Sequence, residues 1–266
     1  MRAGHCSERC NGLTMNKHSL MKIRTPQKAP MSLPALLNNV DHKDLRVVTA
    51  HGAQYGDNVM TALSFPHEFR NLQAHYPIVF FKSEETTGFY SAALLGFQEG
   101  ENLFLGEGAW DAAYVPLTVA RQPFLIGHVD GEMLLHVNLD SPRVSETEGE
   151  PVFLEYGGST DFLEQMSSML RAIHDGLEQA PAFHAALQEF NLLESFVFDV
   201  ELLDGTQHRM AGCYTINEDR LRALDGRALE QLSRAGFLEP IYMVIASLSN
   251  LRALAERKRR AHVDGQ

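Results

Sequence analysis

The sequence of 266 residues has no long apolar run, only three cysteines and a single tryptophan. Its longest apolar stretches, such as residues 242–248, are much shorter than the roughly 18–20 residues that a membrane-spanning helix requires. The first 30 residues also lack the apolar core of a secretory signal peptide. We therefore expect a soluble cytoplasmic protein with no membrane span.

The three cysteines give little indication of function. Cys6 and Cys10 lie near His5 and His18, but their spacing matches no common zinc-finger pattern. Cys213 lies in an apolar stretch, the usual setting of an inert buried thiol. We expect no cofactor.

Positive charge is also scarce, since 34 acidic residues face 23 basic residues and the formal net charge is −11. Residues 1–30 hold six basic residues and one acidic residue, and residues 252–266 hold five basic residues and two acidic residues. The body between these basic ends is therefore strongly acidic. Such a body excludes a nucleic-acid coat, which needs clustered lysine and arginine, and its field favours cationic partners.

Regular patterning begins only after Met31. We expect residues 1–30 to be a disordered arm or the product of a misassigned start, with Met1, Met15, Met21 and Met31 as alternative first residues. We expect residues 31–260 to form a single domain and residues 261–266 to be a disordered tail.

Several short segments have the composition of strands. We expect strands at 45–50, 77–81 and 89–97, and a hairpin at 124–139 around the turn Asp130-Gly131. In this hairpin a two-residue turn pairs Val129 with Glu132, so His128 faces Met133 and His136 faces Leu125. We expect a second hairpin at 195–216 that turns at Asp204-Gly205, and a further strand at 240–247. In this second hairpin Asp199 and Glu201 alternate with apolar residues, which places the two acidic side chains on a solvent-exposed face.

Apolar residues at helical spacing predict the helices. They cover residues 64–77 with Ser64 as N-cap, 160–178, 181–192, a short turn capped by Thr215 or Asn217, 227–235, and 249–260. Because strands pair as hairpins and helices lie between them, we predict an α+β fold with a mainly antiparallel sheet packed with several helices. The basic end of the last helix either complements the helix dipole or docks on acidic groups of a partner or of the chain itself.

Five blocks in the body resemble one protein family. They are YPIVF at 76–80, GENLF at 100–104, YVPLTVARQPF at 114–124, DGTQHRMAGCYTINEDRLRAL at 204–224 and GFLEPIYMVIASLSNLRAL at 236–254. From about Leu45 to Lys258 the chain resembles the SapC-like family of bacterial proteins. The resemblance implies a link to a surface layer, or a setting beside TonB-dependent receptors, flavin-dependent tryptophan-halogenase-like proteins and cupin-like oxygenases. It carries over no set of catalytic residues.

The triplet His128-Val129-Asp130 is a candidate metal site. Non-haem iron oxygenases combine such an H-x-D pair with a distal histidine, for which His208 and His184 are candidates. Against this, Asp130 is already needed in the hairpin turn. The glutamates at 146, 148 and 150 lack the spacing of a calcium loop.

Standard catalytic motifs are missing from the sequence. It contains no G-x-S-x-G elbow, no Walker A loop and no G-x-G-x-x-G pattern. Trp110, Tyr114, Arg121 and Phe124 have a composition favoured in binding surfaces, although the same residues would also suit a core.

We therefore expect a non-catalytic binding or accessory protein, linked to a bacterial uptake, surface or modification system, with a protein or small-molecule partner. The alternative is a metal-dependent oxygenase that uses His128, Asp130 and His208. A weaker alternative is a surface-layer component.

Overall fold

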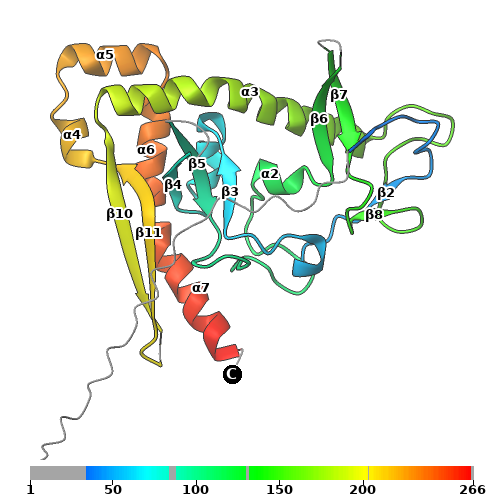
Figure 1. The fold of residues 1–266 in the computed structure, drawn as a ribbon, viewed down its shortest axis with the longest axis horizontal. Helices are drawn as coiled ribbons and strands as arrows, with labels where there is room; N and C mark the ends of the chain where they lie inside the picture. Colours follow the sequence, from blue (N-terminus) through cyan, green and yellow to red (C-terminus); the bar gives the residue numbers. More distant parts are fainter. Residues whose placement is uncertain (1–33, 84–87, 130–131, 203, 265–266) are drawn as a thin grey trace, which may run out of the picture.

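The computed structural model describes residues 34–83, 88–129, 132–202 and 204–264. It shows the predicted α+β fold, in which antiparallel sheets built from hairpins pack with helices (Figure 1). The predicted arm at 1–30 lies outside the described residues. The last helix continues to Asp264, into the segment 261–266 for which we expected disorder.

The larger sheet has five antiparallel strands. In spatial order they are β10 (Leu193–Glu201), β11 (Gln207–Ile216), β4 (Ile78–Lys82), β5 (Phe89–Leu94) and β3 (Thr61–Ser64). The predicted strands at 77–81 and 89–97 and the predicted hairpin at 195–216 are confirmed. The first core lies on this sheet and includes the fully buried Tyr76 and Phe80.

Two smaller antiparallel sheets surround a second core. One contains β1 (Ala35–Leu36), β7 (Glu132–Val137) and β6 (Phe124–Val129), and the other contains β8 (Val144–Ser145), β2 (Arg46–Val47) and β9 (Glu150–Pro151). The register of the β6–β7 hairpin is the predicted one, since His128 pairs with Met133 and Leu125 with His136. The strand expected at 45–50 is only the two residues of β2.

One long helix, α3 (Asp161–Glu189), connects the two cores along the top of the molecule in Figure 1. Thr160 caps it by accepting a hydrogen bond from the backbone N–H of Leu163. The prediction of two helices, 160–178 and 181–192, is wrong because Pro181 lies inside this helix. Proline removes one helical hydrogen bond, but apolar positions on both sides of it continue to be buried, and this burial keeps the helix continuous.

Two other predictions of secondary structure are wrong. Ser64 does not cap a helix, because it pairs with Ser91 at the end of β3, and α1 covers only Phe69–Leu72. The segment predicted as a strand at 240–247 belongs to helix α6 (Leu238–Ser247). A short unbroken apolar run suits a buried strand and a buried helix equally, and its proline falls in the first helical turn, where proline is tolerated.

The remaining helices are short or lie near the C-terminus. They are α2 (Leu117–Ala120), α4 (Glu218–Arg222), α5 (Gly226–Arg234) and α7 (Asn250–Asp264). Asn217, one of the two predicted caps, caps α4. No helix within the described ranges has both the length and the apolarity to cross a membrane.

The basic end of α7 docks on acidic groups of the chain itself. Lys258 forms an ion pair with Glu101, and both side chains are largely buried. Arg257 pairs with Asp111, and its guanidinium lies 4.4 Å from the centroid of the Phe104 ring. The loop at 98–111 therefore anchors the C-terminal part of α7, in addition to the apolar packing of this helix on the first core.

We predict that Gly176→Ala lowers the free energy of unfolding by about 1–2 kcal/mol, although alanine favours helices over glycine. A Cβ at Gly176 would lie 2.5 Å from Cγ of the buried Phe65 and 2.6 Å from Cε1 of His67. Urea unfolding measures the effect. Gly226→Ala in α5 is the matched control, because the added Cβ has no neighbour within 4 Å apart from the adjacent residues and the backbone of its own helix. Equal behaviour of the two variants would contradict the close packing of α3.

Candidate functional site

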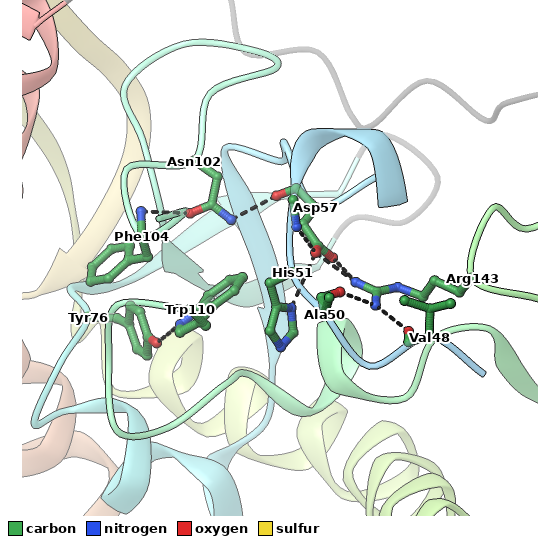
Figure 2. Close-up of polar contacts among 10 residues, drawn as sticks. Val48, Ala50, His51, Asp57, Tyr76, Asn102, Phe104, Trp110 and Arg143 are labelled. Atoms are coloured by element: carbon green, nitrogen blue, oxygen red, sulfur yellow. Dashed lines mark hydrogen bonds and ion pairs between the residues drawn. The ribbon is translucent and has the colours of Figure 1, made fainter. Parts of the chain in front are cut away.

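A buried ion pair between Asp57 and Arg143 joins two distant loops. The two side chains are 0% and 3% exposed. Nη2 of Arg143 donates to both carboxylate oxygens of Asp57, at 2.7 and 2.6 Å (Figure 2). Nη1 donates to the carbonyl oxygens of Val48 and Ala50, at 3.0 and 2.8 Å. The guanidinium thus fixes both ends of the segment 48–57.

Asp57 also positions a histidine. Nδ1 of His51 lies 3.2 Å from Oδ2 of Asp57, and the backbone N–H of Gly52 donates to the same oxygen at 3.0 Å. Burial alone would raise the pKa of Asp57, but the hydrogen bonds from His51, Gly52 and Arg143 outweigh it, and the pKa lies below its ordinary value. The carboxylate is therefore ionised in the folded protein.

The Asp57–His51 pair has the geometry of two members of a catalytic triad, in which the aspartate orients the histidine. A triad also needs a hydroxyl or thiol nucleophile beside the histidine. Among the residues described by the structure, no hydroxyl or thiol forms a hydrogen bond with His51. The imidazole instead contacts Trp110 edge to face, with ring centroids 5.3 Å apart. The arrangement supports a structural role for this pair.

Asn102 connects the ion pair to the loop that holds α7. Its Nδ2 donates to the carbonyl oxygen of Asp57 at 2.7 Å, and its Oδ1 accepts from the backbone N–H of Phe104 at 3.0 Å (Figure 2). Phe104 in turn supports Arg257 of α7. A continuous set of contacts therefore runs from the ion pair to the C-terminal helix.

Two of the residues predicted for binding, Trp110 and Tyr114, belong to a chain of partly buried hydrogen bonds. Nε1 of Trp110 donates to Oη of Tyr76 at 2.6 Å, and this hydroxyl donates to the carbonyl oxygen of Tyr114. Oη of Tyr114 donates to Oε1 of Glu68 at 3.1 Å, and the backbone N–H of Leu117 donates to the same oxygen at 2.8 Å. Oε2 of Glu68 is buried without a partner among the described residues. This carboxyl therefore sits in surroundings that disfavour its ionised form.

The other two predicted binding residues lie elsewhere. Phe124 is fully buried in the second core, and Nη1 of Arg121 donates to its carbonyl oxygen at 2.6 Å. Trp110 and Tyr114 pack against the first core. The four residues therefore do not form one exposed surface, and Phe124 is unavailable to a partner.

Two of the three candidate metal ligands lie in separate sheets. His128 lies in β6, His208 lies in β11 of a different sheet, and Asp130 falls outside the described residues. His184 is buried in α3 against Phe80, and burial lowers its pKa to about 4. Within the described parts of the chain, no group of three or more histidine, cysteine or carboxylate side chains is placed to hold a metal.

The remaining candidates behave as ordinary surface or core groups. Asp199 and Glu201 are exposed between buried or half-buried neighbours, as predicted, and Asp199 pairs with Arg209 at 2.7 Å. Cys213 is buried, and burial raises the pKa of its thiol to about 11. The glutamates at 146, 148 and 150 are exposed.

An open groove lies between strand β10 and helix α7. It has a volume of about 950 Å³. Its lining is mainly apolar and consists of Phe196, Phe198, Leu248, Ser249, Leu251, Arg252, Ala255, Glu256 and Arg259. The Phe196 and Phe198 rings stack at 6.3 Å, and the Phe198 ring stacks on Phe97 at 6.1 Å. The groove therefore presents aromatic surface that the described residues leave uncovered.

The charged residues that line this groove are two arginines and one glutamate. Arg252 is exposed and has no ion pair within the described residues, whereas Arg259 pairs with Glu256 at 2.6 Å. A second hollow of about 470 Å³ on the adjacent face of α7 is lined by Asp111, Ser249, Arg252, Ala253, Glu256, Arg257 and Arg260. Arg252 lines both hollows, as do Ser249 and Glu256. The outer face of α7 is therefore a basic region on an acidic protein.

A protein-family model described as SapC matches residues 37–254. No curated protein matches the chain. No solved structure matches it either.

We predict that Asp57→Asn lowers the free energy of unfolding by about 3–5 kcal/mol, because it leaves the buried Arg143 charge without a counterion. Thermal and urea unfolding measure the loss. Asp199→Asn is the control, because it breaks an exposed pair with Arg209, which salt and water screen. A loss as small as that of the control would show that the buried pair is unimportant.

We predict that Glu68 makes stability depend on pH. Burial raises its pKa from 4.5 to about 7, so the folded state holds this proton more tightly than the unfolded chain. The stabilisation is complete below about pH 4.5 and is lost as the pH rises through 7. Glu68→Gln keeps an acceptor for Tyr114 and Leu117 but cannot ionise.

Urea unfolding of wild type and Glu68→Gln at pH 5 and pH 8 provides the measurement. Relative to the variant, the wild type is expected to lose up to about 3 kcal/mol of unfolding free energy between these pH values. Parallel pH profiles for the two proteins would refute the assignment.

Proposed function

Because this chain belongs to the SapC family, we propose that it is a non-catalytic binding protein that docks a partner in the groove between β10 and α7. The observation that carries the proposal is the uncovered aromatic surface of Phe196 and Phe198 in that groove. Aromatic side chains next to arginine are the groups that contribute most to binding in protein interfaces.

The groove has the rigid walls that a preformed binding site needs. On one side, the β10–β11 ladder holds Phe196 opposite Cys213 and Phe198 opposite Met210. On the other side, the Lys258–Glu101 ion pair fixes α7 against the loop at 98–111. A partner therefore meets a surface whose shape does not have to be created on binding.

The resemblance to SapC-like proteins supports an accessory role in a bacterial uptake, surface or modification system, and we propose a cytoplasmic location and no cofactor. A metal-dependent oxygenase receives less support, because His128 and His208 lie in different sheets. A surface-layer component has no observation in its favour beyond the family name.

Affinity capture from lysate of the cells that make the protein tests the proposal. We predict that Phe196→Ala lowers recovery of the specific partner about tenfold, as expected for a contact worth about 1.4 kcal/mol. Tyr242→Ala is the control, because this exposed aromatic residue of α6 does not line the groove. A partner retained equally by both variants would place binding elsewhere.

A further inference from the structure

The geometry points to an amphipathic, acidic helix of a partner protein as the occupant of the β10–α7 groove, an inference that rests on the proposed function. Three properties of the groove lead to it: its charge, its length and the nature of its strand wall.

The charge of the rim selects an acidic partner. Arg252 is exposed and lines both hollows, Arg260 lines the second hollow, and neither forms an ion pair within the described chain. The protein as a whole carries a net charge of −11, so an acidic partner is repelled from most of its surface. The outer face of α7 is then a region where an acidic segment finds two uncompensated positive charges close to an apolar groove.

The floor of the groove selects an apolar stripe. Phe196 and Phe198 lie on the strand side, and Leu251 and Ala255 lie on the helix side. From Leu251 to Arg259 the helix wall runs for about 12 Å, at 1.5 Å per residue. Two to three turns of a docked helix cover this length and present apolar side chains at i, i+3, i+4 and i+7.

The strand wall disfavours a partner that adds a strand to the sheet. β10 is the edge strand of the five-stranded sheet, but its register shifts between Phe196 and Phe198. Exposed Asp199 and Glu201 follow on the same strand. Irregularities and charges of this kind protect an edge from strand addition. With strand addition disfavoured, a partner binds the groove through side-chain contacts, and a docked helix makes contacts of this kind.

Three synthetic peptides of 15 residues test the inference. The first has leucine and phenylalanine at helical spacing with glutamate on both flanks. The second replaces each glutamate with lysine. The third has the composition of the first in an order that destroys the apolar stripe. Fluorescence anisotropy measures their affinity for the full-length protein, its Phe196→Ala and Arg252→Glu variants, and the Tyr242→Ala control, after thermal unfolding has shown that each variant folds.

We expect the acidic amphipathic peptide to bind at least tenfold more tightly than the other two peptides. Phe196→Ala is expected to weaken it about tenfold, Arg252→Glu to remove the preference over the lysine peptide, and Tyr242→Ala to have no effect. Equal or tighter binding of the lysine peptide, with Phe196→Ala weakening both, would overturn the acidic occupant and leave the proposed groove intact. If Phe196→Ala does not change peptide binding, the acidic helical occupant and the proposed binding groove are both overturned.

Sedimentation of the protein alone measures its oligomeric state and so tests whether a second copy of the chain occupies the groove. A monomer supports docking of a separate partner. A dimer that Phe196→Ala dissociates would overturn the inference, because the groove would then be filled by another copy of this chain.

Discussion

The buried ion pair between Asp57 and Arg143 is the constraint on which the arrangement of the loops depends. Removing two charges from water is costly, and Coulomb attraction offsets this only when the remaining hydrogen-bonding groups are also satisfied. Here His51, Gly52 and two backbone carbonyls provide most of these bonds, and the Nε of Arg143 is the one nitrogen of the pair that is buried without a partner among the described residues. The pair therefore favours this loop arrangement, because displacing one loop alone leaves the other charge buried without its counterion.

The consequences of that arrangement extend to the proposed binding site. Asn102 connects the backbone of Asp57 with Phe104, and the same loop provides Glu101 and Asp111 to α7. This loop, together with the core packing of Leu251 and Leu254, therefore positions α7, and α7 is one wall of the groove. Some of the acidic residues of the body have a structural role here, since Glu101 and Asp111 neutralise basic side chains of α7. Arg252 remains outside that compensation and is available to a partner.

The sequence predicted the features that depend on neighbouring residues. The hairpins and the register of His128 and His136 follow from the period of two and from Asp-Gly turns. Whether residues 238–247 form a helix or a strand, and whether α3 continues through Pro181, depends on how these segments are buried against other elements. A local sequence pattern does not contain this information. The buried ion pair could not be predicted from the sequence. Asp57 and Arg143 are 86 positions apart, and nothing in the turn-rich segment around Asp57 indicated a buried charge. The aromatic composition around Trp110 favours binding, but Trp110 and Tyr114 pack against the first core and Phe124 lies in the second.

The most direct test of the connection between ion pair and groove is hydrogen–deuterium exchange of the Asn102→Ala variant. This change removes the bridge from Asp57 to Phe104 and leaves the ion pair itself in place. Faster exchange is predicted in residues 98–111 and throughout α7, with unchanged exchange in the β6–β7 hairpin. Exchange of α7 at the wild-type rate would contradict the claim that this loop positions the wall of the groove.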